Sequence, residues 1–383
     1  MTNQKKKTVK ISFDQRERSV AVIRALVRSG FFQNELPTEM NLSRVMHMPR
    51  TYISHAITQL VAEGLLKSTT GSNWHIDYDD QYQNSVAFII NTNPLHGWQS
   101  VFLDFFIGFE EILFQEGYRA LMIGNFVSTK EKQEKIASLR ANGCMGFALV
   151  SRSEKKILSF MEEEAVPCVL LGNATLNEEG FGCVCTDNDA GMTKTIDYLV
   201  EKGHRRIAYY STGLGFHDGI KVRLNSYLRN MRRYHLPPIS EICYPEPHHK
   251  LSAERAVETL SHMTLKPTAI ICGNDREAFE LVSILKYKGV RIPADVSIVG
   301  LGNNYYGQLL DPPVTTLDIH AVNMGQIAAH YLLNEMMAPQ LPVKIMIPTE
   351  MIERNSVTSI PTQENPVPSD STPESDPSGI LTF

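Results

Sequence analysis

The sequence has no apolar run long enough to cross a membrane, because none reaches the roughly 18 residues that a bilayer requires. The start, MTNQKKKTVKISFDQRER, carries charge but no apolar stretch, which is not the pattern of a secretory signal. The six cysteines form no CxxC pair and show no zinc-ligand spacing, so we interpret them as reduced thiols. These features predict a cytoplasmic protein.

Signatures of common enzyme sites are also missing. The sequence contains no P-loop, no nucleophile elbow and no paired-carboxylate motif. Gly213, Gly215 and Gly219 follow a predicted strand, but their spacing differs from the dinucleotide-binding fingerprint. His248 and His249 lack a third ligand at a suitable spacing, so no metal site is predicted. We therefore expect a binding protein without a cofactor rather than an enzyme.

Charge is distributed unevenly along the chain. The net charge of −5 argues against a protein that coats nucleic acid along its whole length, but it leaves room for one basic module. Residues 1–15 form a basic tail, which is either a solvated segment or an arm that adds phosphate contacts. Residues 356–383 are rich in proline, serine and acidic side chains and are predicted to be disordered.

Residues 16–76 predict a small helical domain that ends in a β-hairpin. The expected elements are an apolar helix around 20–27, a second helix capped by Thr38, a third helix between Pro49 and Gly64, and a hairpin of 65–68 with 74–76. Three helices followed by a hairpin make a winged helix-turn-helix, an α domain with a small β wing.

This segment resembles the gluconate-repressor (GntR) family through Leu36-Pro37-Thr38-Glu39, Leu42-Ser43, Arg50-Thr51-Tyr52 and Glu63-Gly64-Leu65. The resemblance implies that the third helix enters the major groove of DNA and that the wing lies near the adjacent backbone. The residues that it places at DNA are Ser43, Arg44, Arg50, Thr51, Tyr52, Ser54, His55, Thr70 and Gly71. Met40 and Ser54 stand where the family commonly has arginine, and Pro49 replaces the usual capping serine, so an unusual affinity or base preference is expected. A winged helix that contacts protein is the alternative.

A second region begins after an acidic, polar linker at residues 77–84. From Val86 onward, apolar strands alternate with amphipathic helices, which is typical of a parallel, doubly wound sheet. The alternation predicts an effector-binding and dimerisation domain over residues 85–355. We divide it into two lobes, one formed by 85–187 with 318–340 and the other by 188–317 with 341–355.

The stretch 267–317 predicts a strand, a helix and a second strand. Its loops at 273–275 and 302–304 leave the same edge of a parallel sheet, where open α/β sheets bind ligands. The strings PTAIICGNDREA, GVRIPADVSIVGLGN and PPVTTL resemble the lac-repressor (LacI/GalR) family. The resemblance implies a two-lobed, periplasmic-binding-protein-like type I domain. A winged helix joined to such a domain is a combination known in arabinose-responsive regulators.

The same resemblance supplies candidate effector-binding residues. In relatives, an arginine at the position of Arg223 reaches into the cleft between the lobes and holds hydroxyls or carboxylates, which suits its planar fork of donors. The amide of Asn274 can donate and accept, which matches a sugar hydroxyl, although a helix cap alone explains it too. Relatives usually have Gly-aromatic-Asp where this chain has Gly302-Asn303, so Asn303 is expected to take over part of the role of the missing carboxylate.

Three further candidates follow from their positions in the chain relative to the family. Trp98 and Phe102 come after the first strand, where relatives place the apolar walls of the pocket, but a role in the core is an equal alternative. His217 lies in the loop before Arg223, either at the effector or as a solvated side chain.

Together these features predict a one-component, homodimeric transcription regulator, more specifically a repressor that binds double-stranded operator DNA. A small molecule, expected to be a carbohydrate or a derivative of one, would bind between the lobes and control DNA binding. The alternatives are a solute-binding protein of a transport system, a nucleotide-binding oxidoreductase, and a regulator whose pocket is no longer used.

Overall fold

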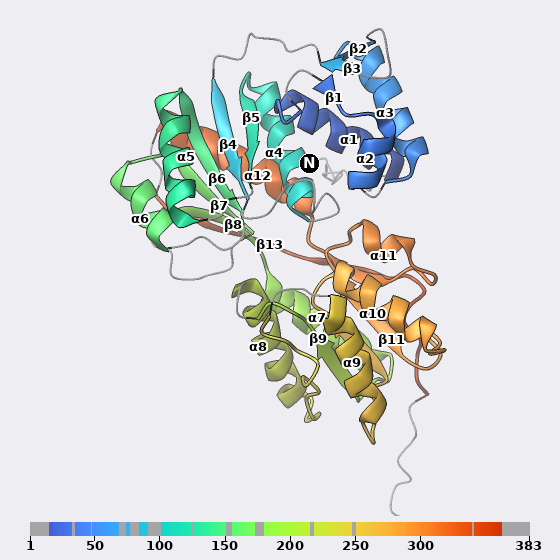
Figure 1. Ribbon diagram of the computed structural model, residues 1–383. Coiled ribbons are helices and arrows are strands. Elements are labelled where there is room, and N and C mark those ends of the chain that lie inside the picture. Colours follow the sequence, from blue (N-terminus) through green and yellow to red (C-terminus); the bar gives the residue numbers. More distant parts are fainter. Residues whose placement is uncertain are drawn as a thin grey trace, which may run out of the picture.

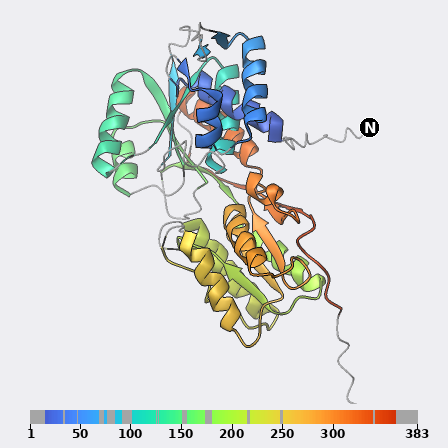
Figure 2. The same cartoon turned by 45° about the vertical axis from the view of Figure 1, so that its right-hand side comes forward.

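The computed structural model describes residues 15–32, 35–46, 48–68, 74–76, 84–90, 101–124, 126, 128–150, 155–172, 180–214, 218–246, 250–338 and 341–361. These residues form a small N-terminal head and two α/β lobes (Figure 1). The head lies beside the first lobe, and the second lobe lies below them in both views (Figures 1 and 2). No helix among the described residues is both long and apolar enough to span a membrane.

The head consists of three helices and a three-stranded antiparallel sheet. Its elements are α1 (Gln15–Arg28), β1 (Glu35–Leu36), α2 (Glu39–Met46), α3 (Arg50–Ala62), β2 (Leu66–Ser68) and β3 (Trp74–Ile76). The sheet order is β1-β3-β2, so the predicted hairpin of β2 and β3 is present and gains a third, short strand. Helix α3 begins without a side-chain cap, because Pro49 stands at its N-cap position.

The first lobe contains a six-stranded parallel sheet in the order β13-β8-β7-β6-β4-β5. Its strands are β4 (Ser85–Ile89), β5 (Arg119–Ile123), β6 (Cys144–Val150), β7 (Cys168–Leu171), β8 (Gly182–Thr186) and β13 (Lys344–Ile347). Its helices are α4 (Val101–Gln115), α5 (Thr129–Ala141), α6 (Lys155–Glu163) and α12 (Ala321–Met337). The inner strands β4, β6, β7 and β8 are almost wholly buried, as expected when helices cover both faces of a parallel sheet, whereas the edge strands β5 and β13 are partly exposed.

The second lobe contains a five-stranded sheet in the order β14-β12-β11-β10-β9, in which only β14 is antiparallel. Its strands are β9 (Ile207–Tyr210), β10 (Ala269–Cys272), β11 (Ser297–Leu301), β12 (Thr315–Asp318) and β14 (Glu350–Ile352). Its helices are α7 (Asn188–Glu201), α8 (Asp218–Arg233), α9 (Lys250–His262), α10 (Asp275–Tyr287) and the short α11 (Tyr305–Leu309). The predicted α/β architecture with parallel sheets is therefore confirmed.

The predicted division of the lobes requires one correction. Residues 341–355 were expected in the second lobe, but β13 pairs with β8 in the first lobe and only β14 joins the second. The chain thus passes between the lobes three times, at 186–188, 318–321 and 347–350. The apolar run at 343–347 predicts a strand, but its sheet is decided by a partner more than a hundred residues away, which the local pattern does not contain.

The predicted disorder of 356–383 is wrong for its first residues. The Ser356 hydroxyl donates to the Ile298 carbonyl at 2.6 Å and accepts from the Thr315 amide at 2.8 Å, and its side chain is fully buried. The Thr358 amide donates to Ser297, and the Ile360 amide donates to the Lys202 carbonyl. This segment therefore fastens the chain to the second lobe, while 362–383 lie outside the described residues.

Replacement of Ser356 by alanine should destabilise the second lobe. The change leaves the buried Thr315 amide without its acceptor, which costs about 1–2 kcal/mol. Urea unfolding of the full chain measures this loss. The matched control is Ser261→Ala, which removes an exposed hydroxyl whose hydrogen bond stays within α9 of the same lobe. Equal stability of the two variants would contradict the role given to residues 356–361.

Helices α4 and α12 cross in direct backbone contact. A Cβ atom on Gly108 would lie 1.9 Å from the Val322 carbonyl oxygen, and one on Gly325 would lie 1.9 Å from the Phe105 carbonyl oxygen. Both glycines are therefore needed for the close approach of the two helices. Because α12 begins directly after the crossover at 318–321, this contact links the junction of the lobes to α4.

Candidate functional site

The candidate effector site lies on the edge of the second lobe where its parallel strands end. Strands β9, β10, β11 and β12 run in the same direction, so their carboxyl ends share the edge from which β12 passes to the first lobe. Polar loops at 211–214, 273–275 and 302–304 follow the first three of these strands. This is the place where open α/β sheets bind ligands.

Arg223 lies on this edge and contacts the first turn of α7. Its Nη1 atom donates to Asn188 Oδ1 at 2.8 Å. Its Nε atom is buried and has no hydrogen-bond partner among the described residues. Asn188 is itself buried, and Asp187 caps the helix behind it by accepting from the Ala190 amide at 3.0 Å. The Nη1 atom of the guanidinium is therefore held by Asn188, and the Nε donor can bind an oxygen of a ligand.

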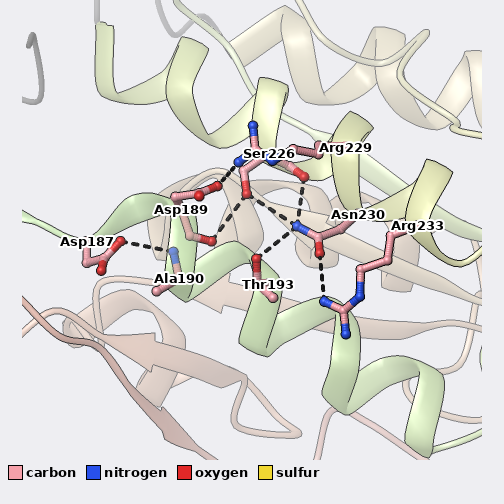
Figure 3. Close-up of polar contacts among 8 residues, drawn as sticks. All are labelled: Asp187, Asp189, Ala190, Thr193, Ser226, Arg229, Asn230 and Arg233. Atoms are coloured by element: carbon pink, nitrogen blue, oxygen red, sulfur yellow. Dashed lines mark hydrogen bonds and ion pairs between the residues drawn. The ribbon is translucent and has the colours of Figure 1, made fainter.

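Helix α8, which carries Arg223, is fixed to α7 by a polar network (Figure 3). Asn230 Nδ2 donates to Thr193 Oγ1 at 2.9 Å, and the Ser226 hydroxyl donates to the Asp189 carbonyl at 3.2 Å. Arg229 forms an ion pair with Asp189, shown by a dashed line in Figure 3. These contacts fix the position of α8 and hence the direction from which Arg223 approaches the edge.

A buried carboxylate contacts the loop that follows β9. Glu277, which is 1% exposed, accepts from the Thr212 amide at 2.8 Å and from the Thr212 hydroxyl at 2.7 Å. Burial raises the pKa of Tyr209 to about 12, while the nearby Arg223 acts to lower this pKa and Glu277 to raise it. Asn188, Tyr209 and Glu277 were not predicted, because nothing in their local sequence indicates that they lie at this edge of the second lobe.

Asn274 serves as the N-cap of α10. Its Oδ1 atom accepts from the Glu277 amide at 2.9 Å, as the capping interpretation predicts. The side chain is half-buried, and its Nδ2 atom makes no hydrogen bond with the described residues. The cap therefore fixes Asn274 while leaving a donor at the candidate site.

Asn303 is engaged within the lobe. Its Nδ2 atom donates to Asp318 Oδ2 at 3.0 Å, and its Oδ1 atom accepts from Arg354 Nη2 at 2.5 Å. The residue adopts a φ of 51°, which turns the chain back toward β12. Both ends of its amide are thus bound to neighbouring side chains, and Asn303 is less suited to an effector than Arg223.

Asp275 forms the buried centre of the network around Asn303. It accepts from Thr316 Oγ1 and from the Asn304 amide, both at 2.7 Å. Burial raises the pKa of Asp275 to about 6, although these two hydrogen bonds and the charge of Arg354 act to lower it. A Cβ atom on Gly300 would lie 2.1 Å from Asp275 Oδ1, so the glycine makes room for the carboxylate.

Some predicted residues cannot be placed at the site. Phe102 is half-buried, packs against the core of the first lobe and lies 6.5 Å from Phe105 between ring centroids, which fits the core alternative. Trp98, His217, Thr70 and Gly71 lie outside the described residues. The same is true of His248 and His249, and the described residues contain no group of three side chains that could hold a metal ion.

The candidate DNA-binding residues gather on α2 and α3. Arg44, Arg50 and Thr51 are exposed, with 72% of the Arg50 side chain accessible to solvent. Tyr52, Ser54 and His55 are half-buried on α3. Glu39 Oε2 accepts from both Arg50 Nε at 3.1 Å and Ser54 Oγ at 2.8 Å.

Ser43, a predicted DNA contact, makes a hydrogen bond within the head. The Ser43 hydroxyl donates to the Met48 carbonyl at 2.6 Å and so closes the turn between α2 and α3. Sequence comparison with a family does not separate such a turn contact from a DNA contact, because both require a small polar side chain at the same position.

Comparisons with known proteins agree with this architecture. A family described as "Periplasmic binding protein-like domain" matches residues 196–357. The chain is 24% identical over 341 residues to the HTH-type transcriptional repressor PurR of Klebsiella pneumoniae. This alignment covers 85% of this chain and 98% of PurR. The chain is 25% identical over 344 residues to the arabinose metabolism transcriptional repressor of Geobacillus stearothermophilus, covering 85% and 92% respectively.

A third relative and two solved structures extend the comparison. The chain is 26% identical over 220 residues to the probable HTH-type transcriptional repressor ExuR of Bacillus subtilis, which is 57% of this chain and 66% of ExuR. A LacI family regulator from Enterococcus faecium with bound ribose superposes with a TM-score of 0.61 at 22% identity, covering 72% of this chain and 99% of that one. A CelR–cellobiose complex gives a TM-score of 0.64 at 19% identity, covering 84% and 100%.

The fold and these relatives define a class of protein. The chain carries a periplasmic-binding-protein-like domain, and its homologues are transcriptional repressors rather than enzymes. It is accordingly a transcription regulator related to these repressors.

Proposed function

We propose that this chain is a cytoplasmic, dimeric repressor whose head binds operator DNA and whose two lobes bind a small molecule. The observation that carries the effector part is Arg223, which is held by Asn188 at 2.8 Å and keeps a buried Nε atom without a partner among the described residues. Leaving a buried donor unsatisfied costs about 1–3 kcal/mol, and a ligand oxygen at this position removes that cost.

The chemistry of the edge suits a polyhydroxylated ligand or a sugar acid. The Arg223 fork offers directional donors, and the Nδ2 atom of Asn274 offers another. The ribose and cellobiose in the related structures support a carbohydrate as the class of effector. The transport alternative is not favoured, because the relatives are repressors.

The head supports DNA binding of the winged helix-turn-helix type. Helix α3 projects Arg50 and Thr51 into solvent at its N-terminal end, which is the end that reads base edges in helix-turn-helix proteins. The hairpin of β2 and β3 follows α3 directly and takes the position of a wing. The GntR-like motifs at 36–39, 50–52 and 63–65 support the same assignment.

Two measurements on the full chain test the proposed function. Selection from a random duplex library should enrich a related set of sites, as expected of specific binding by a dimer. A thermal-shift screen of sugars and sugar acids should find compounds that raise the unfolding midpoint, since a ligand of the folded state stabilises it. Enrichment of no sequence would contradict the repressor assignment, and a flat screen would contradict the carbohydrate effector.

Replacement of Arg50 by alanine should weaken binding to the selected duplex by about 10- to 100-fold, because an arginine contact to DNA is worth about 1–3 kcal/mol. Fluorescence anisotropy at several salt concentrations measures this loss and shows whether Arg50 contacts phosphate. Removal of a phosphate contact should lower the salt slope by about one, whereas a lost base contact should relax sequence preference. The matched control is Arg291→Ala, which removes an exposed arginine from the second lobe.

A further inference from the structure

The head is in contact with the first lobe through one helix of each. Helix α1 packs on α4 and reaches the start of β5, as Figures 1 and 2 both show. The same helix packs on α3 within the head. Apolar side chains of the head and of the first lobe form one continuous core cluster, to which Ile23 and Leu26 of α1 and Phe106 and Ile107 of α4 belong.

A buried ion pair lies in this contact. Arg18 Nε donates to Asp104 Oδ1 at 2.7 Å, and the two side chains are only 10% and 12% exposed. A buried pair adds little net stability, but loss of one partner leaves an uncompensated buried charge, which is strongly unfavourable. Such a pair therefore specifies one arrangement of α1 on α4 and penalises others.

A second pair of charges repeats the pattern toward the other end of both helices. Arg28 lies 3.9 Å from Glu110, measured from Nη1 to Oε1, and its guanidinium carbon lies 3.7 Å from the centroid of the Phe114 ring. Glu110 is 5% exposed, and burial raises its pKa to about 7 although the charge of Arg28 opposes the shift. Beside the pair, a cavity of about 650 Å³ is lined by α1, α4 and the end of α3.

Arg119, at the start of β5, adds a third contact between the head and the first lobe. A Cβ atom on Gly30 would lie 2.0 Å from the Arg119 Nη2 atom, so the arginine lies directly against the chain that leaves α1. Gly30 has a φ of 74°, which is the left-handed conformation that glycine adopts without strain. The turn after α1 is thus fitted to the surface of the first lobe.

We propose that the head is held on the first lobe as a docked unit through α1 and α4, with Arg18–Asp104 as the contact that fixes its orientation. The DNA-reading role of α3 rests on the proposed function, but the docking itself does not. In the docked arrangement α1 lies between α3 and α4, so α3 follows any movement of the first lobe.

Docking completes a continuous path from the effector edge to α3. The crossover at 318–321 leads into α12, which crosses α4 closely at Gly108 and at Gly325. Helix α4 in turn holds α1 through Asp104 and Arg18. A change in the angle between the lobes is then passed to the head as a rigid-body rotation. A head joined to the lobe only by a flexible linker would not follow the rotation of the lobe.

Pulsed electron paramagnetic resonance on the full, DNA-free chain tests the docking. Spin labels are placed on the exposed positions Gln59→Cys in α3 and Lys135→Cys in α5. Of the natural cysteines, five are buried and Cys243 is half-buried with a pKa raised by burial to about 12, so the introduced thiols react first. Labelled chain is mixed with excess unlabelled chain, so that each dimer carries at most one labelled protomer. A docked head then gives one narrow distance distribution, whereas a broad distribution in the chain with Arg18 and Asp104 intact overturns the proposal.

Charge variants then test the ion pair. Arg18→Ala and Asp104→Asn should each lose the narrow peak, and the exchanged pair Arg18→Asp with Asp104→Arg should recover it. Arg16→Ala removes an exposed arginine from the same helix and should leave the peak unchanged. Circular dichroism verifies that the head of each variant is folded. A narrow peak in both folded single variants would overturn the assignment of Arg18–Asp104, whatever the DNA selection shows.

Discussion

Replacement of Arg223 by alanine is expected to abolish the thermal shift caused by the effector while DNA binding persists. The change removes a partly buried guanidinium that Asn188 positions at 2.8 Å, and loss of a buried charged contact to a ligand costs about 2–5 kcal/mol, or about 30- to 5,000-fold in affinity. Isothermal calorimetry with a compound found in the screen measures the affinity. Anisotropy with the selected duplex measures DNA binding.

Two variants make the Arg223 result specific. Arg232→Ala removes an exposed arginine from the last turn of the same helix and should leave effector affinity unchanged. Arg223→Lys keeps the charge but loses the planar fork, so an intermediate affinity is expected. If the alanine variant binds the compound like the wild type, the effector does not bind at the edge described here.

Replacement of Gly325 by alanine should destabilise the first lobe by about 3 kcal/mol, because the added methyl group would overlap the backbone of α4. The direction of the change in unfolding free energy is informative. At a helix position with free space around it, a Gly-to-Ala substitution stabilises a protein by about 1 kcal/mol. Thermal or urea unfolding of the full chain measures the change. The helices must separate to accept the methyl group, so loss of the contact between α4 and α12 is the physical cause.

Gly219→Ala is the matched control for Gly325. Gly219 is helical, and the nearest atoms to a Cβ atom there lie 3.7 Å away, so a neutral or slightly stabilising effect is expected. Equal effects of the two substitutions would show that α4 and α12 do not need their backbone contact. In that case the contact of α4 with α12 could not carry movement from the crossover at 318–321 to the head.

Much of the candidate site could be anticipated from local patterns. The apolar run before Gly273 and the capping position of Asn274 both follow from residues close in sequence, and the structure places them as expected. Arg223 was located through a family motif, and it lies on the edge where the strands end. The partners of these residues were not predicted, because Asn188 is 35 positions from Arg223 in the sequence.

Asn303 has hydrogen-bond partners that the motif around it does not contain. The sequence has an amide where relatives have a carboxylate, which suggested a substituted effector contact. The structure pairs that amide with Asp318 and Arg354, the latter 51 positions away. No pattern around residue 303 contains the position of Arg354, because β14 brings it there by pairing with β12.

The sequence by itself determined the alternation of strands and helices, the polar loops after the strands and the presence of a separate helical head, since each depends on periodicity and capping within a few residues. Tertiary structure alone decided which sheet takes β13, that residues 356–361 are fastened to the second lobe, and that Arg18 meets Asp104 across 86 positions. The reason is physical: burial and hydrogen bonding between distant segments select among arrangements that local sequence leaves equal in energy.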